Sequence, residues 1–149
     1  MGRVPLSDLA CSVARTLDVV GERWTLLVLR DAFQGKSRFE EFTRSLPIAR
    51  NILSDRLSLL VENGILERSA YQQRPTRYEY RLTPKGFELY PVIVALLQWG
   101  DRYLAGAEGP PLELLHKECG GSISAQAVCS CGAAVSARDI RSVSHSRSA

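Results

Sequence analysis

The feature that most constrains this fold is a change of hydrophobic period at Gly64. Before Gly64, apolar residues recur every three or four positions, which is typical of amphipathic helices. After it, Tyr78, Tyr80 and Leu82 alternate with charged residues, which is typical of a strand with an apolar inner face and a charged outer face. The chain is therefore predicted to be mainly α with a small β-hairpin (α+β), and the helices come first.

Four helical segments are expected before the hairpin: residues 11–20, residues 22–33, a short helix ending at Arg44, and a helix between Pro47 and Gly64. The third segment opens with Ser37 and Glu40 at the spacing of an S-x-x-E capping box. In the fourth, Leu53 and Leu57 share an apolar face. The helices and the hairpin follow one another in the order of a winged helix-turn-helix.

The hairpin is expected to pair a strand from Ile65 to about Tyr71 with the strand around Tyr80, through a polar connection that contains Pro75. A helix then runs from Pro84 to about Leu104, weakened in its first half by a glycine and a proline. Its apolar stripe is either core or a dimer seam, and consists of Ile93, Leu96, Leu97, Gly100 and Tyr103.

Positive charge is concentrated on the hairpin. The formal net charge of the whole chain is only +3, but residues 68–81 hold four arginines against Glu79 alone. Phosphate contacts of a nucleic acid are expected from two arginines before and within the third helix and two on the hairpin, namely Arg38, Arg44, Arg74 and Arg77. Arg56 is compatible with a salt bridge or with a phosphate contact.

Three polar residues near the start of the fourth helix, Arg50, Asn51 and Ser54, are predicted to read bases. Arginine can bind guanine through two hydrogen bonds, and asparagine can bind adenine in the same way. The opposite face of this helix carries the leucines, so these side chains are free to enter the major groove of double-stranded DNA.

Three runs of sequence together resemble the HxlR-type bacterial transcription regulators: CSVARTLDVVGERWTLLVLRDAFQGKSRFEEF, IARNILSDRLSLLVENGILER and RYEYRLTPKGFELYPVIVALLQWGDRYL. The resemblance covers about residues 11–104. It implies a homodimer that dimerises through its terminal helices and binds a palindromic operator. The two recognition helices of such a dimer lie about 34–36 Å apart.

Two kinds of signal are compatible with this resemblance. Some members of the family sense electrophiles or oxidants through an N-terminal cysteine, and Cys11 occupies such a region, although small buried cysteines are often inert. The alternative is a small aromatic effector held at the dimer seam by Leu96, Trp99 and Tyr103. Trp24 is expected to be core.

The chain is predicted to divide into a winged-helix domain with its dimerisation helices (1–104), a linker (105–111), a small Cys/His module (112–140) and a disordered tail (141–149). The module carries His116, Cys119, Cys129 and Cys131, a donor set that a tetrahedral structural zinc site requires. The C-x-C spacing departs from the usual C-x2-C and forces adjacent ligands into a tighter geometry, so one interpretation of the site leaves either Cys129 or Cys131 unbound. Free thiols, or a disulfide formed on oxidation, are the alternatives.

Several classes of function are disfavoured. No apolar run reaches the roughly 20 residues of a membrane span, and no signal peptide is evident, so a cytoplasmic protein is expected. There is no carboxylate pair at catalytic spacing, no nucleophile elbow and no phosphate-binding loop, so no enzyme is expected. We expect a DNA-binding repressor released by a small-molecule or redox signal. A winged helix that binds only proteins is the alternative.

Overall fold

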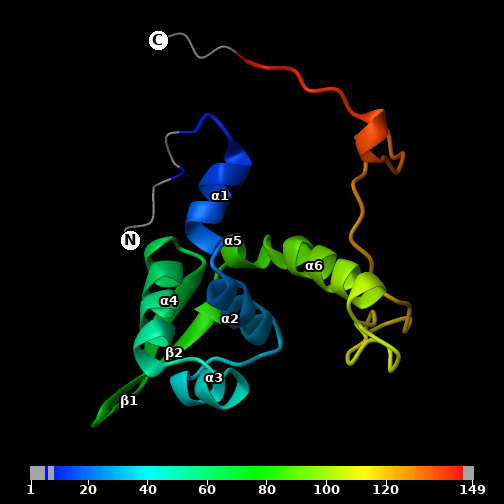
Figure 1. Ribbon diagram of the computed structural model, residues 1–149. Coiled ribbons are helices and arrows are strands. Elements are labelled where there is room, and N and C mark those ends of the chain that lie inside the picture. The colour runs from blue at the N-terminus through cyan, green and yellow to red at the C-terminus, as the bar shows by residue number, and fades with distance from the viewer. Residues whose placement is uncertain (1–5, 7–8, 146–149) are drawn as a thin grey trace. The chain divides into compact units, whose positions relative to one another are not determined.

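The computed structural model describes residue 6 and residues 9–145. The elements follow in the order α1 (Ser12–Val20), α2 (Arg23–Phe33), α3 (Phe39–Ser45), α4 (Arg50–Glu62), β1 (Leu66–Gln73), β2 (Thr76–Leu82), α5 (Pro84–Phe87), α6 (Tyr90–Tyr103) and the 3-10 turn η1 (Ala137–Asp139) (Figure 1). The mainly helical winged helix-turn-helix with a two-stranded hairpin is confirmed.

Carboxylates fix the starts of two helices. Glu22 precedes α2 and its side chain accepts hydrogen bonds from the backbone amides of Trp24, at 2.8 Å, and Thr25. Before α3, Glu41 accepts from the amides of Ser37 and Arg38, each at 2.8 Å. The predicted capping box was therefore wrong by one residue. Glu41, not Glu40, accepts hydrogen bonds from the amides of the two residues that precede α3.

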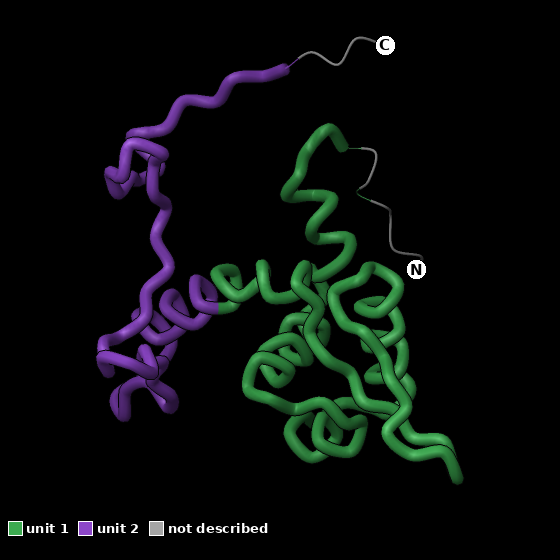
Figure 2. The backbone as a smooth tube through the Cα atoms, turned by 180° about the vertical axis from the view of Figure 1, so that it is seen from behind, with its two compact units in different colours: residues 1–93 green, residues 94–149 purple. Residues whose placement is uncertain are grey.

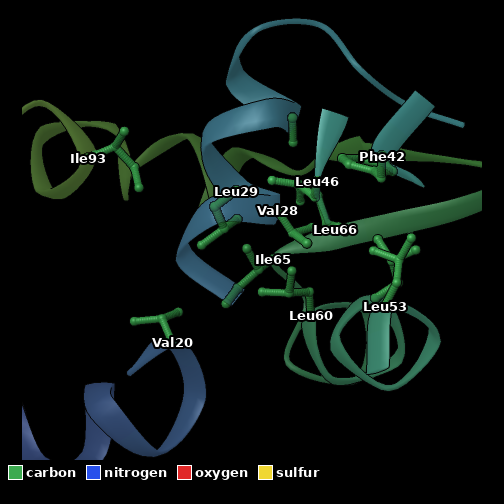
Figure 3. Packing of buried hydrophobic residues seen from close by; sticks show 12 residues of the cluster. Val20, Val28, Leu29, Phe42, Leu46, Leu53, Leu60, Ile65, Leu66 and Ile93 are labelled. Carbon is green, nitrogen blue, oxygen red and sulfur yellow. The ribbon is translucent and has the colours of Figure 1, made fainter. Parts of the chain in front are cut away.

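The core forms where α2, α3, α4 and the base of the hairpin meet (Figure 3). Leu53, Leu57 and Leu60 supply its α4 face, and each has no exposed surface. The apolar face predicted for this helix is confirmed. Packing of this face fixes the rotation of α4, and Ser54, Asp55 and Ser58, which lie between its leucines, are exposed.

The two strands pair in antiparallel register, with Leu66 opposite Leu82 at the base and Gln73 opposite Thr76 near the tip. The amide of Tyr80 also donates to the carbonyl of Ser37 at 2.7 Å, which ties β2 to the segment before α3. The predicted inner face is only partly correct. Tyr80 and Leu82 pack on the core, whereas Tyr78 lies further along the hairpin and is exposed.

The predicted helix from Pro84 to Leu104 is divided in two. Thr83 caps α5 through a 3.0 Å hydrogen bond from the Gly86 amide, and α6 begins at Tyr90, just before Pro91. The exposed apolar stripe of α6 differs from the predicted one. Ile93 is buried in the core, whereas the exposed large apolar residues of α6 are Val92, Leu96, Trp99 and Tyr103. These four recur at helical spacing, so they share one face of α6.

The chain forms two compact units, residues 1–93 and residues 94–149 (Figure 2). The first contains the core and the hairpin, and α6 crosses the boundary at Val94. In the second unit no described residue beyond Val94 is buried. Residues 146–149 of the predicted tail lie outside the described residues. No helix in the described part of the chain has the length and hydropathy for a bilayer crossing.

Candidate nucleic-acid interface

A basic groove of about 570 Å³ lies on the first unit between α3, the start of α4 and the hairpin. Four of the seven residues predicted to contact DNA line it: Arg38, Arg44, Arg50 and Arg77. The other lining residues are Phe39, Glu40, Glu41, Tyr71, Thr76, Tyr78 and Tyr80. The fold thus brings arginines that are 39 positions apart in sequence to one surface.

Arg50 is the most constrained of these arginines. Its Nη2 donates to Glu40 Oε1 at 2.8 Å and its Nη1 to Glu40 Oε2 at 3.3 Å, and the guanidinium lies 4.8 Å from the centroid of the Phe39 ring. The hydrogen bond from Arg50 is the largest cause of the lowered pKa of Glu40. A bidentate contact with guanine would therefore have to replace the pair with Glu40.

In the described part of the chain, three of the arginines that line the groove have no carboxylate close enough to neutralise their charge. Among the described residues, Arg38, Arg44 and Arg77 form no salt bridge with a carboxylate within 4.0 Å. Arg38 instead stacks over the Tyr71 ring, with 4.2 Å between the guanidinium carbon and the ring centroid. An arginine held by an aromatic ring retains its donors for an anionic partner.

Aromatic residues of the hairpin are the part of the groove that the prediction missed. Tyr71 and Tyr78 both line it, and Arg68 lies over Tyr78 at 4.4 Å. The signal was the interleaving of tyrosines with arginines between residues 68 and 81. From the sequence, this interleaving predicts only a strand with one apolar and one charged face.

The remaining predicted DNA contacts lie outside the groove lining. Asn51 and Ser54 are exposed on α4, on the face opposite its leucines, and Arg74 is exposed at the tip of the hairpin. Arg56 forms a salt bridge with Glu22, with 3.5 Å between Nε and Oε2, and is largely buried. It therefore links α4 to the cap of α2.

Comparison with known proteins places this geometry in a family. The HxlR-like helix-turn-helix profile matches residues 19–108. The chain belongs to the HxlR family of helix-turn-helix transcriptional regulators. The sequence resemblance is thereby confirmed, and this DNA-binding family is one of regulators, not enzymes.

Some relatives of this HxlR-family protein match most of the chain, and others match only part of it. An HTH-type transcriptional regulator of Mycobacterium tuberculosis strain H37Rv is 49% identical over 130 residues, 87% of this chain and 82% of the relative. The crystal structure of PA1607, a candidate transcription factor, is 38% identical with a TM-score of 0.83, covering 92% of this chain and 96% of that one. Reduced HypR, a redox regulator, is 36% identical with a TM-score of 0.58, covering only 62% of this chain but 92% of its own. Residues beyond the winged helix are thus shared with some relatives and lack a counterpart in shorter ones.

The predicted signal residues are exposed. Cys11 is a free thiol at the position before α1, and the Arg15 amide donates to its carbonyl at 3.1 Å. In the second unit, the rings of Trp99 and Tyr103 are 5.3 Å apart and line a hollow of about 350 Å³, while Leu96 is exposed outside that lining.

The four predicted metal ligands lie as two pairs. His116 Nδ1 is 3.2 Å from Cys119 Sγ, and hydrogen bonding by Cys131, first through its backbone, lowers the pKa of Cys129. No group of three or more His, Cys, Asp or Glu residues close enough for one metal ion is found among the described residues of the chain.

Proposed function

We propose that this HxlR-family regulator is a homodimeric repressor that binds a palindromic operator. The observation that carries the proposal is the groove in which Arg38, Arg44 and Arg77 converge beside the start of α4. In a winged helix, the third helix of the motif enters the major groove and the wing follows the backbone. Here α4 would enter the major groove, with Arg50, Asn51 and Ser54 toward base edges.

The arginines of the wing and of α3 would hold phosphates. Arg74 at the tip and Arg77 on β2 extend the positive surface beyond the groove, and Arg38 and Arg44 border it on the other side. Contacts of this kind determine affinity and its salt dependence, whereas the α4 side chains would determine sequence preference.

Dimerisation is supported by the exposed apolar face of α6. Val92, Leu96, Trp99 and Tyr103 are 42–63% exposed and share one helix face. An apolar face of this kind is typical of a protein interface, and the family resemblance implies that the terminal helices form it. A second copy would place the two α4 helices on successive turns of one DNA face.

The proposal is tested by fluorescence anisotropy on the DNA upstream of the protein's own gene and on scrambled DNA of equal length, in a salt series. We expect tight, salt-sensitive binding that prefers the native sequence. Absence of any salt-dependent binding to either DNA would favour a winged helix that binds only proteins.

Oxidation of Cys11 is one candidate for the signal that releases the protein from its operator. Its support is the exposure of the thiol next to α1 and the similarity to HypR, a redox regulator. We expect hydrogen peroxide to weaken operator binding by the wild type and to leave Cys11→Ser unaffected. Equal responses of the two proteins would exclude Cys11 as the sensor.

A small aromatic effector is the competing signal. The hollow beside Trp99 and Tyr103 is large enough for one ring system, and Arg102 lines it with a charged group. Quenching of Trp99 fluorescence by a ligand, lost in Tyr103→Ala, would favour this route.

A further inference from the structure

One residue of β1 is left out where β1 pairs with β2. Ala70 lies opposite Tyr78 and Gln72 lies opposite Arg77, so Tyr71 between them is an extra residue on β1. This arrangement is a β-bulge, which interrupts the alternation of side chains along a strand and re-aims a side chain. The side chain at this bulge is a tyrosine ring on the wing.

The Tyr71 ring contacts an arginine from another part of the chain. It lines the basic groove, and the guanidinium carbon of Arg38 lies 4.2 Å from the ring centroid. Arg38 is the residue immediately before α3, so the stack joins the wing to the start of that helix. The bulge thus lies where the wing meets a predicted phosphate contact.

The backbone of Arg38 is fixed from two sides. Its amide donates to Glu41 Oε2 at 2.8 Å, and the carbonyl of the preceding Ser37 accepts from the Tyr80 amide at 2.7 Å. Its side chain is not fixed by an ion pair, because no carboxylate lies within 4.0 Å of the guanidinium in the described part of the chain. Contact with the Tyr71 ring therefore restricts the guanidinium.

Stacking restricts a guanidinium without occupying its hydrogen-bond donors. The aromatic face attracts the cation, and the five N–H groups of arginine stay free to bind an oxyanion. Arg50 provides the contrast, because it lies over the Phe39 ring but also donates from both Nη atoms to Glu40. Among the described residues that line the groove, Arg38 is thus an arginine held by a ring with its donors still available for a phosphate.

We propose that Tyr71 is a positioning residue for DNA binding: the ring at the bulge holds the Arg38 guanidinium in the groove, where the arginine binds a phosphate of the DNA backbone. The ring makes no phosphate contact of its own. Because Arg38 is already ordered, it loses little conformational freedom on binding, whereas ordering one long side chain ordinarily lowers affinity roughly 2- to 10-fold. The inference rests on the proposed phosphate contact of Arg38, and not on dimerisation or base reading.

The test compares Tyr71→Ala with Arg38→Gln in the full-length protein, by anisotropy on the upstream and the scrambled DNA in a salt series. R38Q removes a phosphate contact, so the slope of log Kobs against log salt concentration should fall by about 0.9 per copy. Y71A keeps every charge, so its slope should equal that of wild type, while its affinity for both DNAs should fall roughly 2- to 10-fold per copy. Wild-type affinity in Y71A would overturn the proposal.

The double variant R38Q/Y71A shows whether the ring acts through Arg38. If it does, adding Y71A to R38Q should change affinity by less than about twofold, whereas independent sites have additive effects. Additive losses would overturn the positioning role. The matched control is Tyr78→Ala, because Tyr78 also lines the groove but lies beside Arg68, so its effect should be the same with and without R38Q.

Two conservative variants test the stack without removing the ring or the charge. Tyr71→Phe keeps the aromatic ring and should bind both DNAs as wild type does. Arg38→Lys keeps the charge but not the planar guanidinium, so it should have the wild-type slope and the weaker affinity of Y71A. Wild-type affinity in Arg38→Lys, or a loss in Tyr71→Phe equal to that in Y71A, would overturn the proposal.

The same data distinguish this inference from the function on which it rests. A wild-type slope in R38Q would refute the phosphate contact of Arg38, and the positioning role of Tyr71 would be refuted with it. A lower slope in R38Q together with additive losses in R38Q/Y71A would refute the positioning role alone and would support the phosphate contact.

Discussion

Removing the charge of the wing should change the salt dependence of DNA binding by an amount that the structure fixes. Arg74 and Arg77 are both exposed, and neither forms an ion pair with a carboxylate within 4.0 Å in the described part of the chain. The proposed homodimer carries two wings, so R74Q/R77Q would remove four guanidinium groups from it. Each phosphate contact contributes about 0.9 to the slope of log Kobs against log salt concentration, so the slope should fall by about 3 to 4.

The assay is anisotropy on operator and scrambled DNA between low and moderate salt. Binding to both DNAs should weaken by a similar factor, because phosphate contacts carry no sequence information. The matched control is R138Q/R141Q, which makes the same change of net charge in the second unit and leaves the wing unchanged. If R74Q/R77Q has the wild-type slope, or if the control lowers the slope equally, the wing does not hold phosphates.

Four further results are expected. R50Q/N51A should lose its preference for the operator while keeping weak, salt-sensitive binding to scrambled DNA, and retained preference in competition assays would contradict base reading by α4. Leu57→Ala should lower the free energy of unfolding by about 2–5 kcal/mol, because Leu57 has no exposed surface. Ser58 is adjacent and exposed, so the control Ser58→Ala should change this free energy by at most about 0.5 kcal/mol. Equal effects of the two substitutions in urea denaturation would refute the placement of Leu57 in the core. Hydrogen bonds from the Ser37 amide and then from the Arg38 amide lower the pKa of Glu41 from its ordinary 4.5. Wild type should therefore be more stable than Glu41→Gln above about pH 4.5, and this difference should disappear as the pH falls through the lower pKa of the folded protein. Thermal melts of the two proteins in a pH series measure the difference. Trp99→Glu should convert the dimer to monomer in sedimentation analysis, and an unchanged mass would place the dimer interface elsewhere than on the exposed face of α6.

Hydrophobic spacing and capping residues predicted an element correctly where only one arrangement of that element fitted the pattern. The leucines of α4 are buried as expected, because a three- and four-residue spacing leaves only one way to place that face on a core. The cap of α3 was misplaced, since Glu40 and Glu41 are adjacent and only the direction of the chain entering the helix decides which carboxylate reaches the amides. On α6 the burial of Ile93 against residues far away in sequence displaced the exposed stripe.

Several side chains of the candidate interface pair with residues far away in sequence, and these pairs could not be predicted from the sequence. Arg56 was equally compatible with phosphate and with a salt bridge until Glu22, 34 positions earlier, was found beside it. The pair between Arg50 and Glu40 joins two helices, and the stacking of Arg38 on Tyr71 joins the residue before α3 to β1. Such pairs follow from tertiary packing, so residue types alone could indicate a basic surface but not which arginines are already engaged.

In the proposed complex, a dimer of this chain reads DNA with α4 while its wings hold the flanking DNA backbone. Hydroxyl-radical footprinting of the wild-type protein on the DNA upstream of its gene tests it most directly. We expect two symmetric protected regions whose centres lie about one helical turn, 34–36 Å, apart, and we expect both to be lost in R50Q/N51A. A single unsymmetric protection, or an unchanged footprint in that variant, would contradict it.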